Sequence, residues 1–235
     1  MSSVLERFRG LVVAGVGVVV AAVIVAVAAY SMGSSEDQAV RDLADQPLDE
    51  LGAPASSCQP VTTAPLAGSV RHVRTGKQVV YPTAPPAYGS HWNEPGVAPA
   101  PFSRKFYSEQ DRPELESLVH NLEHGYTIVW YDETVAGDDD QLDVAKAIAE
   151  KFEGYDDVRY KLIVAPWEAD DVAESGAFPE GSHVAISHWS IGGAEAVNLS
   201  QQAGVVQYCS EPSGAALESF METYPYADSP EPMAG

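Results

Sequence analysis

One uncharged stretch of twenty residues, 11–30, constrains what this chain can fold into more than any other feature. Val and Ala dominate it, and as a helix it is long enough to cross about 30 Å of hydrocarbon. Arg7 and Arg9 precede the stretch, whereas the first charged residues after it are acidic. Because positive charge favours the cytoplasmic side, we expect a single-pass signal anchor at 11–30 in the plasma membrane. Residues 1–10 would then be cytoplasmic and everything beyond residue 30 outside.

A cleaved secretory signal is the alternative interpretation, because Ala26-Val27-Ala28 resembles a small-residue cleavage site. The apolar stretch is longer than a typical signal core, which favours an uncleaved anchor. Both interpretations export the remainder of the chain, so an extracytoplasmic domain is expected in either case.

The net charge of −21 limits the kinds of molecule that this chain is expected to bind. An acidic surface repels nucleic acid and anionic lipid, and it attracts cations. The expected partners are therefore the membrane, through the N-terminal helix, and a metal ion, with no nucleic acid. Solubility in saline surroundings would produce the same acidity, and the sequence identifies no protein partner.

Two cysteines, Cys58 and Cys209, both fall on the exported side. A cysteine pair outside the cytoplasm tends to be oxidised, and the absence of a Cys-x-x-Cys spacing argues against a redox-active pair. We expect a structural disulfide that closes a loop of about 150 residues. In the chain-entropy model such a bridge stabilises the fold by about 4 to 5 kcal/mol.

Composition divides the exported part into three segments. Residues 31–57 are rich in Ser, Ala, Asp, Glu and Pro, and we expect them to form a disordered acidic tether. Residues 58–226 carry the apolar periodicity of a folded extracytoplasmic domain. The proline-containing tail at 227–235 is expected to be loose.

The order of elements expected in this domain is β-α-β-α-β-β-α. A β-rich stretch at 70–81 precedes a long loop at 82–112, whose prolines exclude both a helix and a central strand. The elements that follow are a helix at 113–124, a strand at 126–131, a helix at 141–152, strands at 160–165 and 183–189, and a helix at 214–224, with an acidic surface segment at 167–181. This order predicts an α/β fold with a mixed central sheet and is consistent with a thioredoxin-like domain.

The segment His-Asn-Leu-Glu-His-Gly at 120–125 suggests chemistry rather than packing. A helix here turns an apolar stripe that includes Leu118 and Leu122 toward the core, and His120 and His124 then lie on the opposite face. We expect these imidazoles to face solvent or whatever covers the helix. Two solvated histidines would satisfy the same pattern.

Histidines four residues apart can ligate one metal ion, and neutral imidazole suits copper or zinc. The loop before the helix carries a third histidine, which could approach because a glycine precedes it by two positions. Three histidines with an open position would resemble a catalytic zinc or copper arrangement. The expected ligands are His91, His120 and His124. The residues expected to support them are Glu123, which could also be a fourth ligand, Tyr88 and Trp92.

Two other functions fit these residues. His120-x-x-Glu123-His124 matches an inverted zinc-protease pattern, in which Glu123 would be the catalytic base of a zinc-dependent hydrolase. That function needs a third ligand from a downstream acid such as Glu195. The other alternative is a metal-free interaction or structural domain of the cell envelope, whose acidic face meets a partner. The sequence does not decide whether any reaction is catalysed.

The three remaining histidines are weaker candidates for ligands. His183 and His188 lie five residues apart in an expected strand, so their side chains leave opposite faces. His188, beside Trp189, is expected to be a structural residue with its hydrogen bonds satisfied. His72 lies between basic residues and is expected at the surface.

Two motifs occur in order along the chain, Tyr-Pro-x-x-Pro-Pro-x-x-Gly-x-His-Trp at 81–92 and Val-His-Asn-Leu-Glu-His-Gly-Tyr at 119–126. With the strand end at 163–166 and the closing Phe220 and Pro230-Glu231, they resemble the membrane-anchored prokaryotic family known as domain of unknown function 3105. The resemblance covers roughly residues 65–232.

What the resemblance implies is a single-pass exported protein whose biochemical function is unassigned. It also implies that His91, His120, Glu123 and His124 occupy the motif positions of the family. The chain departs from the family pattern at Tyr88, where serine is usual, and at 188–189, where Ala-Trp is usual. The first departure could alter the loop, and the second could add a local ligand.

Overall fold

The structure is a computed structural model that describes residues 37–67, 70–93, 100–154, 157–193 and 201–233. The expected signal anchor at 11–30 lies outside the described residues. Among those that are described, no helix has both the length and the apolar character needed to cross a membrane.

A five-stranded mixed sheet forms the centre of the described part, in the order β1-β7-β6-β4-β5. Its central strands pair antiparallel, whereas β4 and β5 are parallel. The first strand, β1, adds to the outer edge of β7 in antiparallel register. The strands are β1 (Thr62–Pro65), β4 (Thr127–Tyr131), β5 (Leu162–Pro166), β6 (Val184–Ser190) and β7 (Ala203–Cys209). This architecture confirms the expected α/β fold with a mixed sheet.

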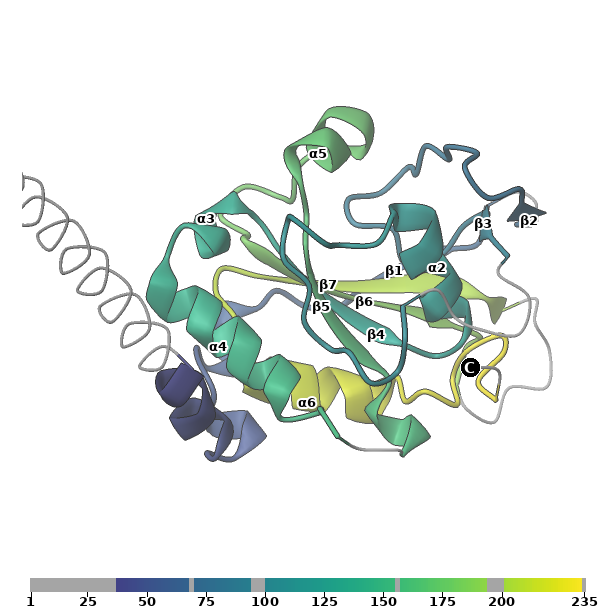
Figure 1. Cartoon of the computed structure of the whole chain (residues 1–235). Coiled ribbons are helices and arrows are strands. Elements are labelled where there is room, and N and C mark those ends of the chain that lie inside the picture. The colour runs from purple at the N-terminus through teal and green to yellow at the C-terminus, as the bar shows by residue number, and fades with distance from the viewer. Residues whose placement is uncertain (1–36, 68–69, 94–99, 155–156, 194–200, 234–235) are drawn as a thin grey trace, which may run out of the picture.

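Helices cover both faces of the sheet (Figure 1). The alternation of side chains along β4 shows how the two layers form: Ile128 and Trp130 pack under α2, whereas Val129 and Tyr131 pack toward α4 and α6. All five residues of β4 are buried, as expected for a strand that is covered on both sides. The helices are α2 (Leu115–Glu123), α3 (Glu133–Ala136), α4 (Asp139–Glu150), α5 (Ala169–Ser175) and α6 (Gly214–Thr223).

The helix that carries the histidine motif, α2, forms for simple physical reasons. Leu118 and Leu122 repeat at helical spacing and are fully buried, with 0% of each exposed. The last residue of the helix is Glu123, and Gly125, two positions later, has a φ of +87° that favours glycine. A Cβ at this position would also lie 2.4 Å from the carbonyl oxygen of Tyr226. The end of α2 is therefore fixed by a close approach of the C-terminal segment.

The expected strand at 70–81 does not join the central sheet. Only His72–Val73 (β2) is extended there, and it pairs in parallel with His91–Trp92 (β3) as a separate two-stranded sheet. Conversely, β1 and β7 were not predicted, and α5 lies within the segment expected to be an irregular acidic surface. These elements depend on pairing and packing with other segments, which a local apolar pattern does not reveal.

The tether expected at 31–57 is wrong for residues 37–57, which pack on the domain. Residues 37–44 are helical, and two 3₁₀ turns follow at Leu48–Glu50 and Ala55–Ser57. Leu51 is 1% exposed and belongs to the core beside α6. The Nζ of Lys151 donates to the carbonyl oxygen of Ala44 at 2.9 Å. A few leucines in a polar segment are enough to dock it when a hydrophobic surface is available.

The predicted disulfide between Cys58 and Cys209 is confirmed, with a sequence separation of 151 residues. It joins the segment that precedes β1 to the last residue of β7, and the backbones of the two cysteines also form a β-bridge. The bridge therefore fixes the start of the folded domain to its central sheet.

Candidate metal site

Four side chains from three elements gather at one end of the domain. One ligand atom each from His72 on β2, His91 on β3, and His120 and Glu123 on α2 lies within 4.8 Å of the other three. We call this group the histidine cluster. Figure 1 shows β2 and β3 beside α2 at the end of the molecule where the chain also finishes. The cluster therefore joins a loop that is remote in sequence to the helix that carries the His-x-x-Glu-His motif.

The backbone before β3 holds His91 in one orientation. Its Nδ1 donates to the carbonyl oxygen of Gly89 at 2.8 Å, since a carbonyl can only accept. Gly89 has a φ of +152°, and a Cβ there would lie 2.7 Å from the ring of Tyr81. The hydroxyl of Tyr81 in turn donates to the carbonyl oxygen of Ser90 at 2.8 Å. This packing leaves Nε2 as the nitrogen that His91 presents to the cluster.

His120 is oriented in the same way by β3. Its Nδ1 donates to the carbonyl oxygen of Trp92 at 2.6 Å, so Nε2 carries the lone pair of the neutral ring. Burial lowers the pKa of His120, although the hydrogen bond to Trp92 acts in the opposite direction. The residue is 2% exposed, so of the two surroundings expected for this face of α2, solvent or a covering segment, it has the second. The loop containing β3 covers that face.

Glu123 supplies the negative charge of the cluster. Its Oε2 lies 3.0 Å from Nε2 of His91 and 3.2 Å from Nε2 of His72. Burial acts to raise the pKa of Glu123, but the hydrogen bonds and charges of His91 and His72 outweigh it and lower the pKa to about 2. The carboxylate is therefore ionised at neutral pH and faces the imidazole nitrogens.

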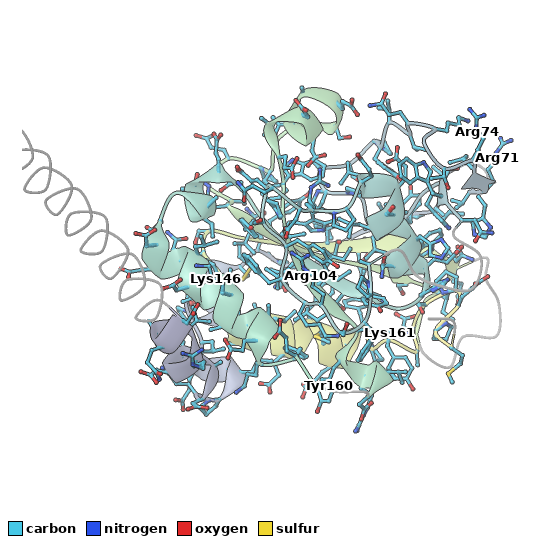
Figure 2. All side chains as sticks on the ribbon, viewed as in Figure 1. Arg71, Arg74, Arg104, Lys146, Tyr160 and Lys161 are labelled. Atoms are coloured by element: carbon cyan, nitrogen blue, oxygen red, sulfur yellow. A yellow bond between two sulfur atoms is a disulfide. The ribbon has the colours of Figure 1, made fainter. Side chains whose placement is uncertain are left out.

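His72 is the member of the cluster that sequence reasoning missed. It was expected at the surface, and its side chain is indeed 41% exposed, but it is also the direct neighbour of His91 in the parallel β2–β3 pair. Arg71 and Arg74 flank it on the same end of the molecule (Figure 2), and both are exposed. A register partner across a two-residue strand leaves no periodic signal in the sequence.

His124, expected as a ligand together with His91 and His120, belongs to a different group. Its ring lies 4.4 Å from the ring of His120 between centroids, yet its ligand atom groups with Glu123 and Glu231 instead. Burial and the charge of His120 lower the pKa of His124 to about 4, so the ring is neutral. The i, i+4 spacing thus brings the rings together without directing them at the same point.

The two expected supporting residues act differently from each other. Trp92 contributes through its backbone, which accepts the hydrogen bond of His120, and its indole Nε1 donates to the carbonyl oxygen of Lys77 at 2.8 Å. The hydroxyl of Tyr88 donates to the carbonyl oxygen of Pro65 at 3.3 Å, and its ring packs on Trp189. Trp189 contacts the edge of the His91 ring, so Tyr88 reaches the cluster only indirectly.

His183, which precedes β6, and His188, on β6, lie outside the cluster. His188 is 0% exposed, and its two nitrogens face the carbonyl oxygens of Tyr126 at 3.1 Å and Asp228 at 2.8 Å. His183 pairs through Nδ1 with Oδ2 of Asp132 at 2.9 Å. Both contacts are those of structural residues, as the sequence led us to expect for His188.

The tail expected to be loose at 227–235 is fixed over the residues that the structure describes. Asp228 is 1% exposed, and its carboxylate accepts from the backbone of Ile191 and Gly193 and from the hydroxyl of Ser190. Further along, the backbone N–H of Glu231 donates to the carbonyl oxygen of Glu123 at 2.9 Å. Proline content alone could not reveal this anchoring, because the partners lie 35 or more residues away in the sequence.

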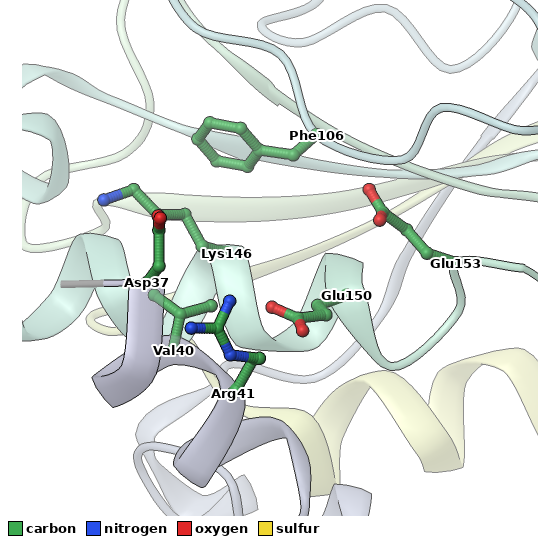
Figure 3. Close-up of a pocket in the computed structure, with 7 residues that line it drawn as sticks. All are labelled: Asp37, Val40, Arg41, Phe106, Lys146, Glu150 and Glu153. Carbon is green, nitrogen blue, oxygen red and sulfur yellow. The ribbon is translucent and has the colours of Figure 1, made fainter. Parts of the chain in front are cut away.

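A surface cavity of about 250 Å³ lies away from the histidines, between the amino-terminal helical residues and α4. Its lining combines opposite charges, with Arg41 and Lys146 facing the carboxylates of Asp37, Glu150 and Glu153 (Figure 3). The two cationic and three carboxylate side chains leave a net charge of −1, and the lining contains neither a histidine nor a cysteine. The histidine cluster is therefore the stronger candidate for a functional site.

Comparison with known proteins identifies the family of the chain but assigns no reaction to it. A family model described as "Protein of unknown function (DUF3105)" matches residues 72–234 and so spans the whole cluster. No curated protein and no solved structure matches the chain.

Proposed function

The chain belongs to the DUF3105 family of proteins of unknown function, and from the geometry of its site we propose that it binds copper or zinc through the histidine cluster. The proposed ligands are His72, His91, His120 and Glu123. Three imidazoles and one carboxylate form a donor set that suits either metal.

The observation that carries this proposal is the orientation of His120. Its Nδ1 is occupied by the carbonyl oxygen of Trp92, and the lowered pKa keeps the ring neutral. The lone pair on Nε2 is therefore free to bind a cation. His91 is held by Gly89 in the same way. Hydrogen bonds from Nδ1 to backbone carbonyls are the outer contacts that typically fix metal-binding histidines.

The proposed ligand set differs from the one expected from the sequence. His72 takes the place of His124, and Glu123 becomes a ligand instead of a support. The exposed edge of His72 gives an ion a path to the cluster, whereas His91 and His120 are enclosed.

A metal-free role remains the main rival. A protonated histidine beside Glu123 would form an ordinary ion pair, and the cluster would then be a structural link between the β2–β3 loop and α2. The domain would in that case act through its acidic surface as an envelope interaction module. This rival predicts that cations bind weakly and without regard to His120.

A zinc-dependent hydrolase has less geometric support. That function needs His120 and His124 on one ion, but their ligand atoms fall into different groups. Its further ligand, Glu195, lies outside the described residues. In the proposed site Glu123 binds the metal and is not placed as a base.

We also propose that the domain is held at the outer face of the plasma membrane by residues 11–30. The Cys58–Cys209 disulfide supports an oxidising compartment. A thioredoxin-like arrangement is proposed for the elements from β4 to α6. Its support is the sheet order β7-β6-β4-β5, with β4 parallel to β5 and with β6 and β7 antiparallel to their neighbours.

The metal content of the full-length chain tests the main proposal. The chain is incubated separately with Zn²⁺ and Cu²⁺, dialysed, and analysed by mass spectrometry of the bound metal. The wild type should retain either or both ions, and His120→Ala should lose that retention. The matched control is His183→Ala, which removes a histidine that binds Asp132 instead. Metal-free wild-type protein, or equal retention by His120→Ala, would overturn the proposal.

A further inference from the structure

We propose that the site holds two metal ions, with Glu123 bridging them. This inference rests on the proposed function, because the first ion is the one in the histidine cluster. The second would bind His124 and Glu231 together with Glu123. The chemical class of the ligand is a divalent transition-metal cation, for which Zn²⁺ is the simplest probe.

The two groups of potential ligands share one carboxylate. Glu123 belongs to the histidine cluster and also to a second set with His124 and Glu231, in which the ligand atoms again lie within 4.8 Å of one another. Its contacts with His72 and His91 both involve Oε2. A carboxylate has two oxygens, and adjacent two-metal sites are commonly linked by such a group.

His124 provides an independent observation that points to a ligand. Its side chain is 7% exposed, and within the described part of the chain its Nδ1 has no hydrogen-bond partner. Its Nε2 faces Oε2 of Glu231 at 3.7 Å, which is too long for a hydrogen bond. Buried polar groups are usually satisfied. A cation bound to Nε2, between His124 and Glu231, would give that nitrogen a partner without moving either residue far, and Nδ1 would then carry the proton.

The C-terminal segment positions Glu231 for this role. Its backbone N–H bonds to the carbonyl oxygen of Glu123, and the next residue is held by Lys161, whose Nζ donates to the carbonyl oxygens of Pro232 at 3.0 Å and His124 at 2.8 Å. One lysine thus ties together the two segments that carry the second set. The side chain of Glu231 is 53% exposed, so water can complete the coordination of an ion there.

The two sites differ in their donors. The histidine cluster offers three imidazoles and one carboxylate, whereas the second set offers one imidazole and two carboxylates. Imidazole-rich sites bind copper and zinc strongly, and oxygen-rich sites bind such ions more weakly. The second ion should therefore bind after the first and dissociate before it.

Zinc stoichiometry of the full-length chain tests the inference. Zn²⁺ is titrated calorimetrically into metal-free protein, and the bound metal is counted by mass spectrometry. We expect two ions for the wild type and one for Glu231→Gln, whose remaining ion keeps its dissociation constant within about threefold. The matched control is Glu218→Gln on α6, an exposed glutamate that should leave two ions bound. His124→Ala should also bind one.

The outcomes separate this inference from the proposal on which it rests. One ion in the wild type, retained by Glu231→Gln and lost in His120→Ala, overturns the two-ion centre and leaves the histidine cluster in place. No ion in the wild type overturns both. Two ions in Glu231→Gln, or none, would show that Glu231 does not belong to a separate second site. Circular dichroism of each variant confirms that it is folded.

Discussion

His120 and His188 are both buried histidines, but their surroundings prepare them for opposite roles. His120 donates from Nδ1 to one backbone carbonyl and presents Nε2 to other potential ligands. His188 faces a carbonyl oxygen at each nitrogen. The difference lies in how many ring nitrogens the backbone occupies, and not in how deeply the ring is buried.

This comparison shows how a histidine can be identified as a ligand or as a structural residue. One carbonyl partner fixes the tautomer and leaves a directed lone pair. Two carbonyl partners use the ring as a link, here between the start of β4 and the C-terminal segment. His91 has one backbone carbonyl at Nδ1, as in the first pattern, but its Nε2 contacts the carboxylate of Glu123 at 3.0 Å. His183, bound to Asp132 near the surface, follows neither pattern.

The largest effect is expected for His91→Ala. The change removes a proposed ligand that is fully enclosed, so the affinity of the cluster for Zn²⁺ or Cu²⁺ should fall by more than about 100-fold. Even an outer hydrogen-bond partner of a metal ligand is worth about 10- to 100-fold. Competition with a chelator of known affinity measures the change. An affinity within threefold of the wild type would mean that His91, like His188, is not a metal ligand.

His188→Ala should affect folding instead of metal binding. Loss of the ring's contacts with two carbonyl oxygens, to one of which a neutral imidazole can donate, and creation of a cavity should lower the free energy of unfolding by about 2 to 3 kcal/mol. Denaturant titration of the metal-free protein gives this value. The folded fraction should bind the same number of ions as the wild type. A variant that is fully stable but metal-free would reverse the roles assigned to the two histidines.

The stability that Glu123 contributes should depend on pH, and this provides a third comparison. Its pKa of about 2 in the folded chain is below the ordinary value of 4.5, so the unfolded state binds more protons between these two pH values. The stability that Glu123 contributes is present above about pH 4.5 and is lost as the pH falls toward 2. In the metal-free protein, Glu123→Gln should therefore lower the free energy of unfolding above pH 4.5 by on the order of 2 kcal/mol.

Denaturant titrations of the wild type and Glu123→Gln from pH 2 to pH 7 measure that contribution. The free energies of unfolding of the two proteins should converge near pH 2. They should move apart as the pH rises to 4.5 and stay apart above it. Curves that remain parallel throughout would mean that His72 and His91 do not hold the carboxylate in the folded state.

The smallest effect is expected for His183→Ala. Its pair with Asp132 is half-exposed, and such surface pairs contribute little. The free energy of unfolding should change by less than about 0.5 kcal/mol, with no change in bound metal. Thermal denaturation and metal analysis check both statements. A loss of bound metal from this variant would show that His183 belongs to the metal site.

The sequence predicted the parts of the fold that repeat locally. Helical spacing identified α2, α4 and α6, and the apolar runs identified β4, β5 and β6. The disulfide followed from the compartment and the cysteine count. By contrast, β1 depends on pairing with residues of β7 more than a hundred positions away, and the docking of Leu51 depends on a surface that other segments build.

The candidate site was predicted in part. His120 and Glu123 were selected because two histidines flank a carboxylate on one helix, and His91 because the loop before this helix carries a third histidine. His124 was placed with His91 and His120 because of helical spacing, which puts rings on one face but does not set where their nitrogens point; its ligand atom groups with Glu123 and Glu231. His72 could not be selected, because its position depends on a two-residue strand beside His91. The backbone carbonyls of Gly89 and Trp92 fix the orientations of the His91 and His120 rings. A sequence pattern does not reveal such backbone contacts.

Anomalous diffraction at the zinc edge, from crystals of the protein grown with Zn²⁺, tests the central claim most directly. The account predicts a peak within bonding distance of Nε2 of His72, His91 and His120 and of the carboxylate of Glu123. No zinc should lie at His188. A map without a peak in the histidine cluster, or with zinc bound by His124 in place of His72, would contradict the account.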